Sequence, residues 1–127
     1  MKTILVDAFH TFVIKDQGIF TEMHQLLETY PNNKIILTNA NDQQVIEFWL
    51  TNLPYPLFSL KHNPDKIDPT YFETMLQHFN LKAEEVIYFE HDTNAIESAK
   101  SVGITSYHYD ETIKDLEKLK TFLDENL

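Results

Sequence analysis

The sequence contains no cysteine, and only ten of its 127 residues are lysine or arginine, against twenty aspartate or glutamate residues. Without cysteine the chain can form neither a disulfide nor a thiolate metal site, and it has no cysteine nucleophile. The formal net charge of -10 repels nucleic acids and anionic membranes, so we expect neither as a partner. A phosphorylated small molecule or a protein remains a candidate partner, and the oligomeric state stays open.

Long apolar runs are missing as well. No segment approaches the roughly 18 consecutive apolar residues of a membrane-spanning helix. The N-terminal stretch TILVDAF lacks the long apolar core of a secretory signal, so we expect a soluble, cytoplasmic protein. A chain of this length with 43% hydrophobic residues supports one ordinary core, which predicts a single domain over residues 1–127.

The apolar residues that are present form five short runs, rich in branched aliphatic and aromatic side chains. The runs are Ile4–Ala8, Lys34–Asn39, Leu57–Leu60, Val86–Glu90 and Ile104–Tyr109. Most are apolar on both alternating faces, which is typical of buried parallel strands. Helical patterns separate them, and this alternation predicts an α/β fold: a three-layer Rossmann-like sandwich with a five-stranded parallel sheet.

Apolar stripes at helical spacing mark the intervening elements. Asn41 with Gln44 resembles a capping box, and Gly103 is placed to end a helix. The last helix is expected from about Thr112, with Ile113 among its inward-facing residues. The other stripes lie within Met23–Tyr30, Val45–Leu53 (including Trp49) and Phe72–Phe79.

Polar side chains gather just after the strands, where open parallel sheets bind their ligands. They include carboxylates, hydroxyls, an amide, lysines and histidines, which is the composition of an anion or metal site. The alternative is that these loops are polar only because strand-to-helix loops generally are, and because they carry helix caps. The segments are Asp7–Thr11, Thr38–Asn41, Lys61–Lys66 and Glu90–Asn94.

Four stretches resemble, in order, the four motifs of the haloacid dehalogenase-like (HAD) superfamily. They are ILVDAFHTF, IILTN, KIDPTYFETMLQHFNL and EEVIYFEHDTNAIESAKSVGI. The resemblance covers nearly the whole chain and implies a HAD-like fold. The segments between the motifs are filled by the predicted elements, so we expect no cap domain.

The resemblance also implies roles for individual residues. Asp7 matches the nucleophile, which forms an aspartyl intermediate in this family. Thr38 matches the hydroxyl that holds the transferring group, and Asn39 is its neighbour. Lys66 matches the cation that offsets charge on the nucleophile and substrate, with Lys61 as a competitor. The alternative is that Asp7 and Thr38 only close strands and that Lys66 is a solvated loop residue.

The motifs are degenerate at three positions. Phe9 stands where phosphatases of the family carry their acid/base aspartate, and phenylalanine cannot transfer a proton. His91 and Ala95 stand where two magnesium-binding aspartates are expected, so a Mg²⁺ cofactor is in doubt. Glu90 and Asp92 flank the first of these positions and could supply carboxylates instead.

A metal site built from these loops would use Asp7, Glu90, His91 and Asp92. Imidazole combined with carboxylates also suits zinc or another transition metal, which is a second hypothesis for the cofactor. Two functions therefore stay open. One is a phosphatase-type hydrolase with impaired chemistry, and the other is a pseudoenzyme that binds a ligand or a protein through the same face.

Overall fold

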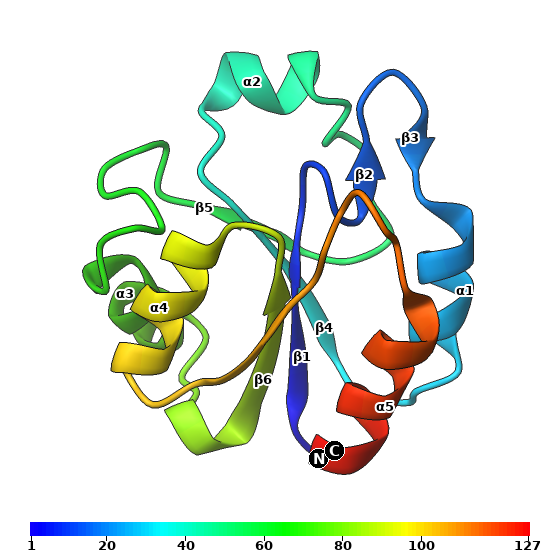
Figure 1. The fold of residues 1–127 in the computed structure, drawn as a ribbon. Coiled ribbons are helices and arrows are strands. Elements are labelled where there is room, and N and C mark those ends of the chain that lie inside the picture. The colour runs from blue at the N-terminus through cyan, green and yellow to red at the C-terminus, as the bar shows by residue number, and fades with distance from the viewer.

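In a computed structural model that describes residues 1–127, a five-stranded sheet lies between helices, and every pairing between its strands is parallel (Figure 1). The predicted fold class is confirmed. The sheet order is β5 (Leu57–Ser59), β4 (Lys34–Thr38), β1 (Thr3–Asp7), β6 (Val86–Glu90) and β7 (Thr105–His108). The helices are α1 (Thr21–Glu28), α2 (Asp42–Glu47), α3 (Thr70–His78), α4 (Thr93–Ser101) and α5 (Leu116–Asn126), with a short 3-10 turn at Ala83–Glu85.

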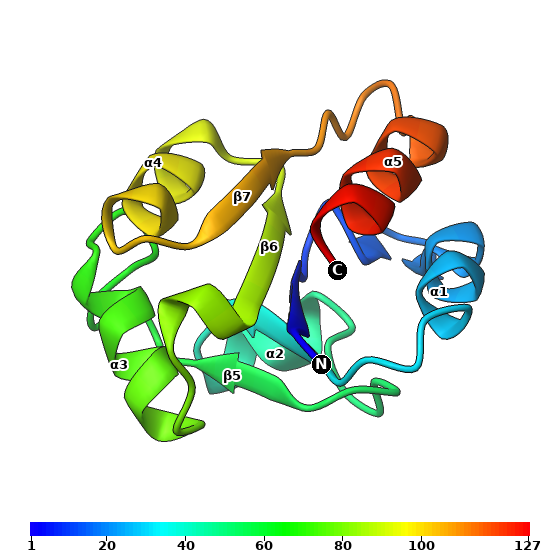
Figure 2. The ribbon, with the colours of Figure 1, turned by 90° about the horizontal axis from the view of Figure 1, so that it is seen from below.

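Two apolar cores fill the spaces on either side of the sheet. Helices α1 and α5 cover one face and α3 and α4 cover the other, as the view from below shows (Figure 2). Because successive side chains of a strand point to opposite faces, Ile4 and Val6 of β1 pack into the first core and Leu5 packs into the second. Because both faces of the sheet are buried, the inner strands carry apolar residues at successive positions.

Helix α2 and a small hairpin lie beyond the carboxyl edge of the sheet (Figure 1). The hairpin pairs β2 (Val13–Ile14) with β3 (Gly18–Ile19), and the sequence analysis did not predict it. It is the only regular structure between β1 and α1, and α2 is the only helix between β4 and β5. Neither connection contains a cap domain.

Two helices are shorter than their apolar stripes predicted. Helix α2 ends at Glu47, and the chain then turns through Trp49, which has a φ of 57° and is 47% exposed. Trp49 therefore does not lie on a buried helical stripe. At the C-terminus, Asp115 caps α5 by accepting a hydrogen bond from the Lys118 N–H at 3.0 Å. The helix thus starts at Leu116 rather than Thr112, and Ile113 is exposed instead of facing inward.

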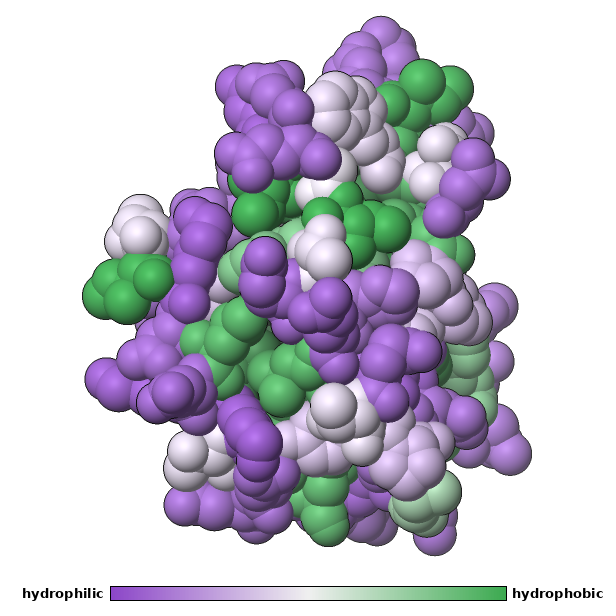
Figure 3. Space-filling model, turned by 90° about the vertical axis from the view of Figure 1, so that its right-hand side faces the viewer, coloured by the Kyte–Doolittle hydropathy of each residue, from purple (hydrophilic) through white to green (hydrophobic).

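The two ends of the chain meet where β1 begins, at the end of the sheet opposite α2 (Figure 1). The Lys2 ammonium donates a hydrogen bond to the carbonyl of Asn126 at 2.9 Å. In the view of the side formed by α1, α5 and the hairpin, apolar residues appear in separate groups among hydrophilic ones (Figure 3). None of the helices combines the length and the apolar character needed to cross a membrane.

Candidate functional site

Two buried carboxylates lie side by side at the carboxyl end of the sheet. Asp7 is the last residue of β1, and Glu90 is the last residue of β6. Val6 pairs with Phe89, so continuing the parallel register by one residue places Asp7 beside Glu90. Both residues are at least 97% shielded from solvent. Two carboxylates cannot be buried this close together unless cations or hydrogen-bond donors compensate their charge.

Lys66 supplies the first cation. Its Nζ lies 2.8 Å from Asp7 Oδ1 and 2.8 Å from Glu90 Oε1, so the ammonium bridges the two carboxylates. The Lys66 backbone N–H donates to Asn39 Oδ1 at 2.7 Å, which fixes the loop that delivers the side chain. Burial by itself would lower the pKa of Lys66, but the Asp7 and Glu90 charges outweigh it and raise that pKa above its ordinary value.

His91 supplies the second cation. Its Nδ1 hydrogen-bonds Asp7 Oδ2 and lies 3.1 Å from Glu90 Oε2. Burial alone would lower the pKa of His91, but the hydrogen bonds to Asp7 and Glu90 outweigh it and raise the pKa to about 10. At neutral pH His91 is therefore an imidazolium, and it faces the two buried carboxyl groups together with Lys66.

Asp7 is held in its ionised form. Burial opposes ionisation, but the Lys66 charge and the His91 hydrogen bond outweigh it, so the pKa of Asp7 lies well below its usual range. Its Oδ2 also accepts a hydrogen bond from the buried Thr11 hydroxyl at 2.7 Å. This carboxylate needs no base to become nucleophilic, although donors from the chain already reach both of its oxygens.

Glu90 differs from Asp7 in its electrostatic environment. Burial and the neighbouring Asp7 charge raise the pKa of Glu90 above its usual value. The Tyr88 hydroxyl donates to Oε1, and the backbone N–H groups of His91 and Asp92 point at Oε2 from 3.1 and 3.2 Å. Glu90 is thus surrounded by donors and completes a closed network with Lys66 and His91.

Thr38 is the last residue of β4 and Asn39 follows it, and both line the same pocket as Asp7. The Thr38 hydroxyl oxygen accepts the Ala40 N–H at 3.2 Å, which leaves its own hydrogen free to donate. Asn39 Oδ1 accepts the Lys66 backbone N–H, which leaves the side-chain NH₂ group of Asn39 free to donate. These two donors could orient an anionic group in front of Asp7.

The pocket in front of Asp7 has a volume of about 210 Å³ and also exposes Lys66, Glu90 and His91. Phe9 forms part of its wall and stacks on Phe48, with ring centroids 4.3 Å apart. His10 lies at the rim with a φ of 72°, and its Nδ1 is 3.3 Å from Glu111 Oε2. The position expected for an acid/base aspartate is thus part of an aromatic wall.

The structure therefore brings Asp7, Thr38, Asn39, Lys66, Glu90 and His91 around one pocket, while their catalytic roles stay predictions. Lys61 lies outside the charged network, in an exposed ion pair with Asp42 at 3.0 Å. Asp92 reaches the pocket rim, but its carboxylate caps α4 by accepting the Asn94 N–H at 2.8 Å.

Two members of the network, Thr11 and Tyr88, were missed by the sequence analysis. Tyr88 could have been found, because residues two apart in a strand share a face and Tyr88 precedes Glu90 by two. Thr11 follows Asp7 by four residues within the predicted loop, and no spacing rule points its hydroxyl back at Asp7.

The residues of the network do not fit a magnesium ion. Ligand atoms of Asp7, Glu90 and His91 lie within 4.8 Å of one another, which is close enough for shared coordination. However, the Lys66 ammonium already bridges the two carboxylates, and the His91 nitrogen that faces them carries a proton. Magnesium prefers octahedral oxygen ligands, and the nearby Asp92 carboxylate is engaged as the cap of α4. We therefore derive no chemical step through a metal.

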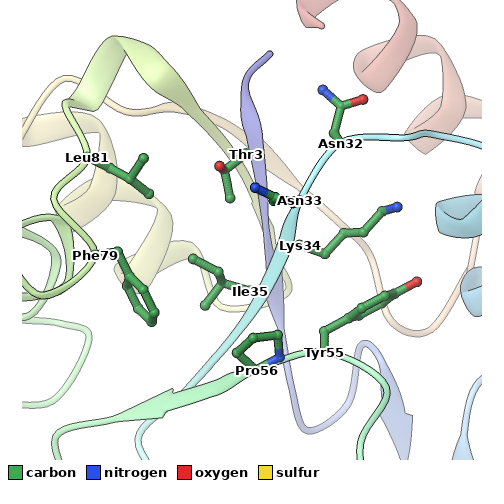
Figure 4. A pocket seen from close by; sticks show the side chains of 9 residues that line it. All are labelled: Thr3, Asn32, Asn33, Lys34, Ile35, Tyr55, Pro56, Phe79 and Leu81. Atoms are coloured by element: carbon green, nitrogen blue, oxygen red, sulfur yellow. The ribbon is translucent and has the colours of Figure 1, made fainter.

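A larger cavity, of about 450 Å³, lies at the opposite edge of the sheet, where β1 and β4 begin (Figure 4). Lys34 and Tyr55 extend to one side of it, and Ile35, Phe79 and Leu81 gather on the other. Two of its polar groups are already engaged, since the Lys34 ammonium donates to the Tyr30 carbonyl at 2.5 Å and the Tyr55 hydroxyl donates to Glu28 at 2.6 Å. The Asp7 pocket is the stronger candidate because it alone combines a cavity with partly free donors and buried charges.

Neither a known protein-family model nor a curated protein matches the sequence. Solved structures do match the fold at low sequence identity. An uncharacterised protein from Corynebacterium glutamicum has a TM-score of 0.68 at 12% identity, over 98% of this chain and 96% of that one. A HAD-superfamily hydrolase of subfamily IA from Geobacter sulfurreducens has a TM-score of 0.64 at 11% identity, over 91% and 99%.

A third structure is a HAD family enzyme from Bacteroides thetaiotaomicron, an alanine variant in complex with magnesium and inorganic phosphate. Its TM-score is 0.63 at 11% identity, over 85% of this chain and 93% of that one. Likeness at this level of identity establishes the fold. With its parallel sheet and its strand order, this chain shares the fold of these solved HAD-superfamily structures, and no cap domain interrupts either connection.

Proposed function

We propose that this chain is a phosphatase-type hydrolase in which Asp7 is the nucleophile. One observation carries the proposal: an ionised, buried carboxylate lies at the end of the central strand, faces a pocket, and has the Lys66 ammonium 2.8 Å away. Oδ1 accepts only this one hydrogen bond, so it retains a lone pair for attack.

In the proposed reaction, Asp7 Oδ1 attacks the phosphorus atom of a bound phosphoryl compound. The bond from phosphorus to the leaving oxygen breaks, and its electron pair departs with that oxygen. Water then attacks the aspartyl phosphate, which releases inorganic phosphate and regenerates Asp7. The Thr38 hydroxyl and the Asn39 amide orient the phosphoryl oxygens, and Lys66 and His91 offset their charge.

Phe9 narrows the class of substrate. Because no side chain stands ready at that position to protonate a leaving oxygen, the leaving group has to depart as a stable anion. Acyl phosphates and p-nitrophenyl phosphate meet this condition, whereas alkyl phosphates do not. We expect the rate to fall steeply as the basicity of the leaving group rises.

The test is turnover of acetyl phosphate and p-nitrophenyl phosphate by the wild-type chain and by Asp7→Asn. Removing the nucleophile should lower the rate by at least about three orders of magnitude. Asp42→Asn is the matched control, because Asp42 lies near the pocket but its side chain is 86% exposed. Equal rates for wild type and Asp7→Asn would refute the proposal, and so would a wild-type chain that turns over neither compound.

A second function, non-catalytic binding of a phosphorylated small molecule or protein, is favoured by a separate observation. Donors from the chain already reach both oxygens of Asp7, which lowers its reactivity. This function predicts that wild type binds p-nitrophenyl phosphate, measured by calorimetry, without hydrolysing it. A phosphoryl adduct on Asp7, detected by mass spectrometry after rapid quenching, would exclude it.

A further inference from the structure

We infer that the Lys66 ammonium and the His91 ring together occupy the place of a divalent cation, so that the two buried carboxylates are satisfied without a metal. The inference deepens the proposed function, since it concerns the same pocket. Its test measures metal binding and stability. The result therefore does not depend on whether the chain turns over a substrate.

The first support is the position of Lys66. Its Nζ contacts one oxygen of Asp7 and one of Glu90 at equal distances of 2.8 Å, as a bridging ion would. The side chain is 94% buried, and Nζ lies 6.0 Å from the centre of the Tyr88 ring. An ammonium packed in this way cannot swing aside into water, so a metal would have to compete with it for both carboxylates.

The second support is His91, which approaches the remaining oxygens. Its Nδ1 bonds Asp7 Oδ2 and lies 3.1 Å from Glu90 Oε2, while its backbone N–H points at the same two oxygens from 3.3 and 3.1 Å. The His91 carbonyl oxygen is in turn 2.9 Å from His108 Nε2 on β7, which holds this backbone in place. Each carboxylate therefore has one cation on each of its two oxygens.

The third support is the shortage of spare oxygen ligands. Ala95, at the position where the HAD motif would place a second aspartate, lies in α4 and lines the pocket without a donor atom. The Asp92 carboxylate is engaged as the cap of the same helix. A magnesium ion would find two carboxylates already paired and a histidine nitrogen, whereas it prefers several oxygen ligands.

The experiment compares metal binding by the wild-type chain and by His91→Asp. Calorimetry and thermal melts in millimolar magnesium chloride, or in EDTA, should show no binding and an unchanged Tm for wild type. His91→Asp removes a cation and adds a carboxylate beside Asp7 and Glu90, so it should gain magnesium binding and a Tm that rises with magnesium by several degrees. Asn94→Asp, which adds a carboxylate at an exposed position outside the network, is the matched control and should not respond.

A rise in the Tm of wild type with magnesium, or zinc retained stoichiometrically after purification without chelator, would overturn the inference. If His91→Asp does not fold, nitrogen-15 NMR of the wild-type chain still decides. The signals of the His91 ring should not move when magnesium chloride is added, and a magnesium-dependent shift of these signals would contradict the inference. Turnover that is absent in a metal-indifferent wild type would refute the proposed function and leave this inference intact.

Discussion

Lys66 is a buried ammonium whose two side-chain partners are both carboxylates. Substituting it with methionine keeps most of the apolar stem but leaves Asp7 and Glu90 facing each other without their bridge. Breaking a buried ion pair by removing one partner costs about 3–5 kcal/mol, so we predict a loss of this size for Lys66→Met in urea unfolding.

The control is Lys61→Met, only five residues away in the chain. The Lys61 side chain is 59% exposed and pairs with Asp42 on the surface, so its removal should cost less than about 1 kcal/mol. Similar losses for the two variants would mean that Lys66 is solvated and that the network described above does not form.

The stability of the chain should fall between pH 6.5 and about 10 because of His91. Its pKa rises from an ordinary 6.5 to about 10 on folding. Below pH 6.5 both the folded and the unfolded chain carry the proton, and the stabilisation is complete. Above it only the folded chain keeps the proton, so stabilisation on the order of 3 kcal/mol is lost as the pH approaches 10.

Several groups face this imidazole: Asp7 from β1, Glu90 from β6, the His10 ring at 5.4 Å and His108 through the backbone. The measurement is the pH dependence of urea unfolding for wild type and for His91→Gln, which cannot titrate. The difference between the two curves should shrink across this window. A constant difference would contradict the assignment of the charge to His91.

Among the secondary-structure elements, helix α4 shows what Asp92 does: this residue is the N-cap of the helix. Its carboxylate accepts the Asn94 N–H at 2.8 Å, so Asp92→Ala should cost about 1 kcal/mol, and Asp92→Ser, which can also cap, should cost less. Neither change should alter turnover or the response to metals. If Asp92→Ala abolished turnover without lowering stability, Asp92 would belong to the reacting site rather than to the helix.

The strands were predicted to within about one residue because most of them are short runs of apolar, β-branched or aromatic residues between polar segments. The helix ends were less predictable. Leu50 and Leu53 continue the apolar spacing of α2, but the chain reverses at Trp49 to bring Leu50 into the core. The hairpin escaped prediction because two strands of two residues each are too short to show a period.

For the molecule as a whole, the order of the elements was the strongest signal in the sequence, because alternating strands and helices admit few topologies. That order also placed the loops of Asp7, Thr38, Lys66 and Glu90 at one edge. The order of the elements did not show which charged side chains form ion pairs in these loops. Lys66 was expected to offset the charge of Asp7, but its bridge to Glu90 depends on how the loop folds back through Asn39.

The meeting of the first and last residues beside Lys2 and Asn126 has a practical consequence. A short peptide joining these two ends would close the backbone into a ring at the edge of the sheet farthest from Asp7. New ends could then be opened elsewhere on the surface, and a tether placed at Lys2 or Asn126 would hold the molecule on a support with its pocket turned outward.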